Sequence, residues 1–337
     1  KGLAIALAVM GLIAIIDLTR HQRMPAVLFP RWLVVILALL FLWAAIGGFI
    51  TQGKIINLSL FTRLLALSVL GLAVHAWIAE LQPVNLRWLE NSLLLGVWAS
   101  VVLVIVYFVL LKFNGQQLWG SNALDRQASV RPGAAVISVL IWPCALIWWR
   151  RCCSLFFFAF FLLPLLCVAP ACAALFSFLS CTVPFFLFPV FCRLGWVLIG
   201  AGLVAFVMLL PSFFQRGPSP AELIQALPSL SSSAQHRLYI WEFSSQKIAE
   251  NPLIGWGFDA SRSIPGGNDA APIGSSLMPL HPHSTALQVW LELGLPGALL
   301  MAALFGFYFF RRSQKLDVSP YEAARSAMLV TLIGNAM

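Results

Sequence analysis

Residues 32–50 read WLVVILALLFLWAAIGGFI, an apolar run without a charged side chain. A helix rises about 1.5 Å per residue, so a run of this length crosses the hydrocarbon core of a bilayer. Over the 337-residue chain, 61% of residues are hydrophobic and 10% are charged. No water-soluble domain could bury so much apolar surface, and apolar runs without strand-like alternation favour helices over a barrel. The sequence therefore predicts an all-α, polytopic transmembrane helical bundle.

Comparable runs recur along the chain. The predicted spans are 2–16, 32–50, 64–79, 93–111, 133–149, 154–175, 177–192, 195–210, 295–310 and an incomplete one from about 323. Both termini, Lys1 and Met337, adjoin apolar patterns, so we expect a partial chain, truncated at the front and at the end. The first run is expected to span the membrane rather than serve as a signal peptide, because no small-residue cleavage site follows it.

One region breaks this rhythm. Between residues 211 and 284, Pro, Gly, Ser, Gln, Asn and Asp accumulate, and no apolar run is long enough to cross a membrane. The sequence thus predicts an N-terminal bundle over 1–210, one large extramembrane loop over 211–284 and C-terminal helices over 285–337. Lys and Arg are more frequent in the short segments that alternation places opposite this loop, so the loop is expected to face away from the cytoplasm.

All seven cysteines lie between residues 144 and 192, among Phe and Pro. The region has no CxxC spacing and no acidic residue, so the cysteines are interpreted as small hydrophobic residues rather than metal ligands. No metal, cofactor or nucleic-acid partner is expected.

Two segments of the loop have helical patterns. From about Ser233 to Glu250, Leu238, Trp241 and Ile248 recur at near-helical spacing, and Ser232 with Gln235 suits a capping box. Arg237 then falls in the first turn, where the helix dipole disfavours a cation and a neighbouring anion would offset the cost.

The second segment, HPHSTALQVWLELGLPG, covers residues 281–297. Thr285 with Gln288 again suits a capping box, so a short helix is predicted from about 286 to 293, with Gly294 ending it and Pro296 starting the next. Leu287, Trp290 and Leu291 would form its apolar side, and Gln288 and Glu292 its polar side. A helix N-terminus disfavours imidazolium, so His283 is expected to be neutral and able to accept a proton.

These segments carry a family resemblance. RLYIW from Arg237, PLIGWG from Pro252, and HPHS followed by LQVWLELGLPG together resemble the O-antigen ligase family, which shares its fold with O-antigen polymerases. His283, Ser284 and Gly294 match the family's pattern of His, a small polar residue, nine residues and Gly. The resemblance implies a multi-pass protein of the bacterial inner membrane, with about twelve helices and its large loop in the periplasm.

The resemblance also implies a reaction. An inverting, metal-independent glycosyltransferase would move a polysaccharide from undecaprenyl diphosphate to a sugar hydroxyl of lipid A-core, among membrane lipids. Arg237 is implied to hold the diphosphate, and His283 to activate the acceptor hydroxyl or help position the carrier. Arg216, His281 and Ser284 are candidate substrate-binding residues. Family members often carry a second functional Arg in a span before the loop, and the corresponding stretch here, 176–191, has none.

Two alternatives stay open at this point. A polymerase of the same superfamily would use a second lipid-linked glycan as acceptor, and the quoted motifs do not separate it from a ligase. A transporter of a lipid-linked solute belongs to a different class. Intramembrane charge pairs or inverted repeats would favour it, but the predicted spans carry few ionisable residues beyond His75.

Overall fold

A computed structural model of the chain describes residues 2–20, 31–52, 57–81, 83–114 and 194–314, with single positions at 140, 143, 144 and 147. Within these ranges the regular structure is helical, and the one β-type pairing is an isolated bridge between Ala270 and Ser276. The prediction of an all-α membrane bundle is confirmed.

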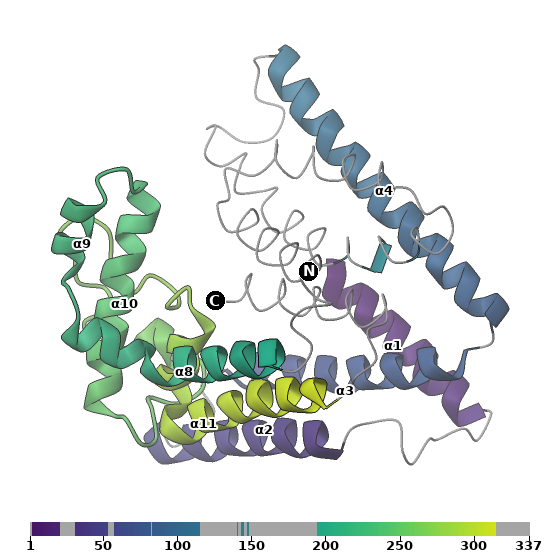
Figure 1. Cartoon of the computed structure of the whole chain (residues 1–337), viewed down its shortest axis with the longest axis horizontal. Helices are drawn as coiled ribbons and strands as arrows, with labels where there is room; N and C mark the ends of the chain where they lie inside the picture. Colours follow the sequence, from purple (N-terminus) through teal and green to yellow (C-terminus); the bar gives the residue numbers. More distant parts are fainter. Residues whose placement is uncertain are drawn as a thin grey trace. The chain divides into compact units, whose positions relative to one another are not determined.

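The helices follow the chain in a simple order (Figure 1). They are α1 (Gly2–Arg20), α2 (Arg31–Gln52), α3 (Leu58–Glu80), α4 (Pro83–Asn114), α8 (Leu194–Arg216), α9 (Pro220–Ala226), α10 (Ser232–Glu250), the 3₁₀ turn η1 (Ala260–Ser263) and α11 (Thr285–Ser313).

Within the described ranges, four helices are long and apolar enough to cross a membrane. These are Arg31–Thr51, Leu58–Ile78, Leu194–Arg216 and Thr285–Ser313. The helices that contain them cover the predicted spans 32–50, 64–79, 195–210 and 295–310, and the predicted spans 2–16 and 93–111 are helical in α1 and α4. The remaining predicted spans, including the cysteine-rich region apart from Cys144, lie almost wholly outside the described residues.

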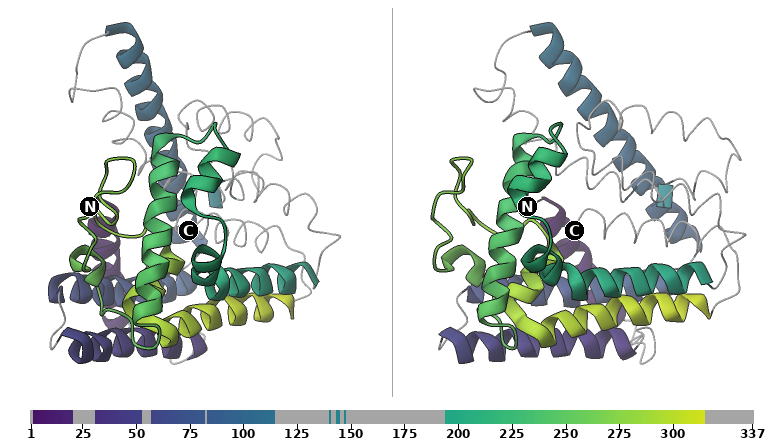
Figure 2. Two further views of the ribbon diagram at one scale, coloured as in Figure 1. Left: turned by 90° about the vertical axis from the view of Figure 1, so that its left-hand side faces the viewer. Right: turned by 60° about the vertical axis from the view of Figure 1, so that its left-hand side comes forward.

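The chain divides into two compact units. One contains residues 1–81 and 194–314, and the other contains residues 82–193 and 315–337, with α4 as its described helix. In the first unit α11 packs against α8 and α2, α1 packs against α3, and α10 leans on both α8 and α11 (Figure 2). All the sequence motifs quoted above therefore belong to one unit.

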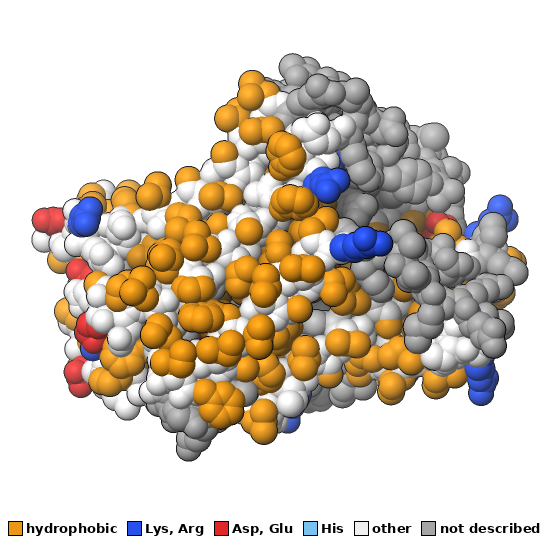
Figure 3. Space-filling model, turned by 90° about the horizontal axis from the view of Figure 1, so that it is seen from below, with side chains coloured by type: hydrophobic (Ala, Val, Ile, Leu, Met, Phe, Trp, Pro, Cys, Tyr) orange, Lys and Arg blue, Asp and Glu red, His pale blue; other side chains and the backbone are white. Residues whose placement is uncertain are grey.

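The surface of this unit is apolar where lipid would contact it. Val35, Leu42 and Phe49, spaced seven residues apart on α2, are 54%, 56% and 60% exposed. Figure 3 shows hydrophobic side chains spread over one face, with acidic side chains mainly at the edge that also carries α9 and α10 in Figure 1. Exposing so much apolar surface to water would be unfavourable, whereas contact with lipid tails is not.

Helix α8 continues past Pro211 to Arg216, six residues beyond the predicted span. Proline has no backbone N–H, so it leaves the carbonyl of Val207, four residues earlier, without its helical donor. The indole Nε1 of Trp290 donates to that carbonyl at 2.8 Å in a buried setting. A side chain of α11 thus fills the gap that Pro211 opens in α8, which lets the helix continue.

Helix α11 is broken at Gly294, as predicted, where the backbone turns to φ 62°, ψ −158°. The segment 252–257, PLIGWG, lies against this break. The backbone N–H groups of Trp256 and Gly257 donate to the carbonyls of Leu291 and Glu292 at 2.8 and 2.9 Å, and Leu295 donates to Pro252 at 2.9 Å. The two separately quoted motifs therefore form one folded unit through their backbones.

Candidate active site

Helix α10 carries part of the candidate site, including Arg237. It covers the predicted range, but it begins one residue earlier than expected: Ser231, rather than Ser232, is the N-cap, and its hydroxyl accepts from the N–H of Ala234 at 3.3 Å. Gln235 donates to the carbonyl of Leu230 instead of completing a capping box. Arg237 consequently lies in the second turn of α10 rather than the first, where the dipole penalty is smaller.

The buried side of α10 is formed by Ile240, Phe243 and Ile248 together with two serines, Ser244 and Ser245. Leu238 and Trp241 are only half-buried. The Trp241 ring packs against Phe214 of α8, with ring centroids 5.5 Å apart. Gln215 of α8 donates to the carbonyl of Ser245 at 2.7 Å, which fixes α10 to the end of α8.

A hairpin-like loop over residues 264–284 faces α10. Backbone bonds from Leu277 to Asp269 and from Met278 to Gly267 hold its two arms together at 2.9 and 2.8 Å. Two side chains of α10 bind its returning arm: His236 Nε2 lies 2.8 Å from the carbonyl of Ser276, and Trp241 Nε1 donates to that of Pro282 at 2.9 Å. Pro282 is buried, and the bond from Trp241 to its carbonyl is partly buried.

The loop ends in the two histidines of the HPHS motif. The rings of His281 and His283 meet edge to face, with centroids 4.3 Å apart, and the backbone N–H of His283 lies 3.3 Å from His281 Nδ1. His283 adopts a left-handed backbone with φ 55°. Its side chain is exposed, so a substrate can reach the imidazole.

The electrostatic setting of His283 agrees with the expectation of a neutral ring. Its pKa is lowered from 6.5 to about 4, first by partial burial and then by the charges of His281, Arg237 and His236. Each of these neighbours disfavours a second positive charge. His283 is therefore neutral at physiological pH, and Arg237 is close enough for its guanidinium to act on the ring electrostatically.

Ser284 follows His283 as the N-cap of α11. The predicted capping box of Thr285 and Gln288 is wrong: the cap lies one residue earlier, and its side chain makes no capping bond. Gln288 instead donates to Glu292. Ser284 is 3% exposed, and its hydroxyl oxygen has no hydrogen-bond partner among the residues that the structure describes.

The structure thus brings four histidine and arginine side chains together, three of which the sequence singled out: His281, His283 and Arg237. The fourth, His236, was not among the candidates. Arg216 is exposed at the last residue of α8 and is not among the charges that act on His283. Its role in substrate binding stays a prediction.

A buried polar network next to this cluster was missed by sequence reasoning. Glu292, expected on a polar helix side, is only 5% exposed. Its carboxylate accepts from the backbone N–H of Asp259 and the hydroxyl of Ser261, each at 2.9 Å, and from Gln288 at 3.2 Å. A single Glu between apolar residues, in WLELG, was the only signal in the sequence.

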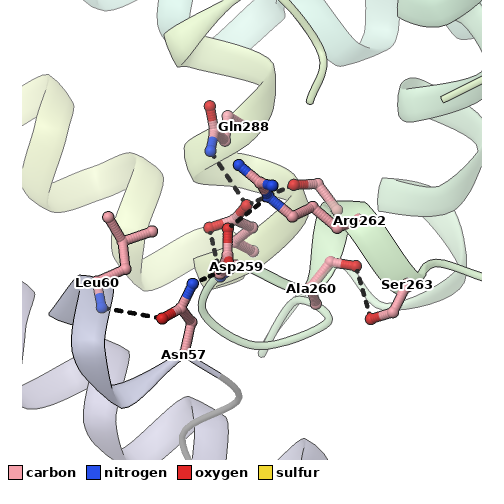
Figure 4. A network of polar contacts seen from close by, with 9 residues as sticks. Asn57, Leu60, Asp259, Ala260, Arg262, Ser263 and Gln288 are labelled. Carbon is pink, nitrogen blue, oxygen red and sulfur yellow. Dashed lines mark hydrogen bonds and ion pairs between the residues drawn. The ribbon is translucent and has the colours of Figure 1, made fainter. Parts of the chain in front are cut away.

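Asp259 extends this network to the first helices (Figure 4). Its carboxylate accepts from Asn57 Nδ2 at 3.0 Å and lies 3.5 Å from Arg262 Nε. Asn57 in turn caps α3 by accepting from the N–H of Leu60 at 2.9 Å. The network therefore ties the segment after PLIGWG to both α11 and α3.

The arrangement can perform acid–base chemistry on an anionic substrate. A neutral, reachable imidazole can accept a proton, and an exposed guanidinium nearby can bind phosphate oxygens. Both groups lie outside the four candidate spans, on the loop and helix that connect two of them. The fold and this cluster define a multi-pass membrane protein with a cluster of histidine and arginine side chains outside its spanning helices.

Comparison with known proteins identifies the family. The sequence pattern of the O-antigen ligase family matches residues 127–302, more than half of the chain, so this chain belongs to the O-antigen ligase family. A proposed polysaccharide ligase of Rickettsia prowazekii is 28% identical over 291 residues, covering 84% of this chain and 69% of that protein. A similarly named protein of Rickettsia typhi is 27% identical with the same coverage, and one of Rickettsia bellii is 28% identical over 278 residues, covering 78% and 64%. No solved structure matches.

Proposed function

We propose that this member of the O-antigen ligase family transfers a polysaccharide from undecaprenyl diphosphate to a sugar hydroxyl of lipid A-core, with inversion and without a metal ion. The observation that carries the proposal is the pairing of a neutral, exposed His283 with the charge of Arg237 on one loop-and-helix unit. The family and the proposed ligase names of the relatives support the same class of reaction.

In this proposal the two residues divide the work. Arg237 binds the diphosphate and offsets the negative charge that grows on it as the bond from the sugar carbon to the diphosphate oxygen breaks. The acceptor hydroxyl attacks that carbon from the opposite face, which inverts the configuration, and its proton passes to His283. Undecaprenyl diphosphate leaves as the second product. His281, Ser284 and Arg216 are proposed to help bind the two substrates.

Binding of the diphosphate donor would also change the pKa of the proposed base, His283. The pKa of about 4 for His283 belongs to a site without a bound anion, in which partial burial and the positive charge of Arg237 both act on the ring. A bound diphosphate would neutralise that charge and add negative charge, which raises the pKa of His283 toward the neutral range. A general base is most effective when its pKa lies near the working pH. The imidazole would then become a stronger base only when the donor is in place.

The proposed location follows from the reaction. Lipid-linked donor and lipid A-core acceptor both reside in the inner membrane, so the loop over 211–284 would lie in the periplasm, between an N-terminal bundle over 1–210 and C-terminal helices over 285–337. Substrates would reach His283 laterally from the bilayer surface rather than from bulk water.

Complementation of a ligase-deficient bacterial strain tests the proposal. Transfer of accumulated carrier-linked polymer to core, seen as lipopolysaccharide bands on a gel, supports a ligase. Restored chain elongation without transfer to core would instead indicate a polymerase. If the protein inserts in the membrane but restores neither transfer to core nor chain elongation, a role in this reaction class is contradicted.

Variants of the two central residues make the test specific. His283→Ala and Arg237→Ala should each abolish transfer while the protein still inserts in the membrane. Arg63→Ala serves as the matched control, because Arg63 is an exposed cation on α3 outside the cluster. Normal surface polysaccharide in both cluster variants would overturn the catalytic assignment.

A further inference from the structure

The segment that carries His283 is attached to α10 at two points. His236 Nε2 bonds to the carbonyl of Ser276, and Trp241 Nε1 donates to the carbonyl of Pro282, the residue directly before His283. The two side chains lie five residues apart on one helix, so they bind positions at both ends of the 276–282 segment. Because a carbonyl can only accept, His236 must carry its proton on Nε2 to make this bond.

His283 needs such support. An L-residue with φ near 55° lies in the left-handed region, which costs free energy relative to the ordinary helical or extended conformations. A conformation of this kind persists only where surrounding contacts fix it. The partly buried bond from Trp241 fixes the peptide unit immediately before His283, and the His283 N–H faces His281 Nδ1.

Other contacts make α10 a rigid support for this purpose. The Trp241 ring packs against Phe214 of α8, and Phe243 lies beside Gly266 in the loop. Gln215 binds the carbonyl of Ser245. The loop is therefore attached to a helix that is itself anchored on a spanning helix, and His283 takes its position from that anchor.

We propose that Trp241 and His236 are positioning residues that hold the loop over 276–283 on α10, and so keep His283 in its left-handed conformation beside Arg237. The proposal rests on the function proposed for His283, because it names the residues that hold this imidazole in position. Neither side chain takes part in a bond-making step. Each acts through the loop backbone.

Conservative variants separate positioning from general stability. Trp241→Phe keeps an aromatic ring against Phe214 but removes the N–H. His236→Gln keeps a donor in place of Nε2, whereas His236→Leu removes it. We expect Trp241→Phe and His236→Leu to lower kcat for transfer about tenfold, with a smaller change in KM, and His236→Gln to retain most of the activity. Trp88→Phe is the control, because Trp88 is 70% exposed on α4.

A second readout does not depend on transfer. Diethyl pyrocarbonate modifies the neutral imidazole, so the pH dependence of modification of His283, followed by fragment-ion mass spectrometry on the purified full chain, reports its protonation. In the unchanged protein the rate should be flat from about pH 5 upward, because the pKa lies near 4. With Trp241→Phe the loop that carries His281 and His283 is expected to relax into water, away from Arg237 and His236 on α10. The midpoint should then rise by about one pH unit or more toward the value of an exposed histidine.

The two readouts separate the failure of this proposal from the failure of the proposed function. If His283→Ala remained active but Trp241→Phe still shifted the titration of His283, the catalytic role would be wrong and the positioning role right. If Trp241→Phe and His236→Leu left both the titration of His283 and kcat at the level of the Trp88→Phe control, the positioning role would be overturned. Equal loss of activity in His236→Gln and His236→Leu would also contradict it.

Discussion

Gly255 and Gly294 lie back to back, and each occupies the space that a side chain on the other would need. A Cβ on Gly255 would come within 2.6 Å of the backbone nitrogen of Gly294, and a Cβ on Gly294 within 2.7 Å of that of Gly255. Both residues also have positive φ, at 77° and 62°. This contact explains why PLIGWG and LGLPG each carry a glycine at this position, since only glycine permits both the approach and the backbone conformation.

Substitution of either glycine should therefore destabilise the protein. Gly255→Ala or Gly294→Ala would introduce a backbone clash and a strained φ, and we expect a loss of about 2 kcal/mol or more of unfolding free energy. Thermal unfolding in detergent measures this. Gly202→Ala on α8 is the control, because no heavy atom lies within 4 Å of its Cβ position. Similar unfolding temperatures for all three variants would refute the close contact.

The bond from Trp290 to Val207 predicts a coupling with Pro211. Trp290→Phe should cost about 1–3 kcal/mol, because it leaves a buried carbonyl without a donor. Pro211→Ala restores the backbone N–H that can bond to Val207, so Trp290→Phe should cost clearly less in that background. A double-mutant cycle on unfolding free energies gives the coupling. Strictly additive effects would show that the indole does not substitute for the missing helical donor.

We expect Glu292 to stabilise the fold as a buried hydrogen-bond acceptor, unlike a carboxylate on the surface. Glu292→Ala would leave the N–H of Asp259 and the hydroxyl of Ser261 buried without their acceptor, at a cost of about 3 kcal/mol. Glu292→Gln keeps one carbonyl oxygen and should cost less. Glu250→Ala, at an exposed carboxylate on α10, should change little. The unfolding free energies of the purified variants can be measured by denaturation. An equal loss in Glu292→Ala and Glu250→Ala would show that the Glu292 network does not stabilise the fold.

The pKa of His283 gives a directional prediction for pH and for Arg237. Because the positive charge of Arg237 helps to lower this pKa, Arg237→Gln should raise it from about 4 toward 6.5, and Arg237→Lys should not. Partial burial remains in both variants, so the rise should be incomplete. Titration of the imidazole by NMR or by pH-dependent modification measures the shift. An unchanged or lower pKa of His283 in Arg237→Gln would mean that the two side chains do not interact as described.

The same shift affects stability with a defined sign. A histidine whose folded-state pKa lies below its unfolded value contributes stability that is complete above about pH 6.5 and is lost as pH falls toward the folded-state pKa. The slope of unfolding temperature between pH 4.5 and pH 6.5 should therefore be smaller in His283→Asn than in the unchanged protein.

Much of the fold could be predicted from the apolar runs and from the capping, Gly and Pro residues that begin and end helices. The runs at 32–50 and 195–210 are helices, and α10 covers the predicted range because its caps and Asn251-Pro252 punctuate it. Gly294 and Pro296 predicted the break in α11 correctly. The cap of α10 lies one residue before the predicted one, because any of the consecutive serines at 231–233 suits an N-cap and the sequence does not distinguish them. Helix α9 was not predicted, although it begins with a capping box of Ser219 and Glu222 and with Pro220 at its first position.

The candidate residues could be named from the sequence, but the contacts that position them could not. The motifs identified His283 and Arg237, yet local sequence does not reveal that Trp241 reaches Pro282 or that Glu292 is buried. Those contacts join residues about 30 to 40 positions apart, and helical periodicity carries no information about such pairs. For the same reason α8 was expected to end at its proline: the donor that rescues it comes from Trp290, in another helix.

The most direct measurement of the central claim is a transfer reaction in proteoliposomes containing the purified protein, a polysaccharide linked to undecaprenyl diphosphate, and lipid A-core. With a neutral His283 beside Arg237 as the reacting pair, His283→Ala should still bind the donor but form no glycosylated lipid A-core, and Arg237→Ala should lose donor binding as well. Product formation by His283→Ala at the rate of the unchanged protein would contradict the account.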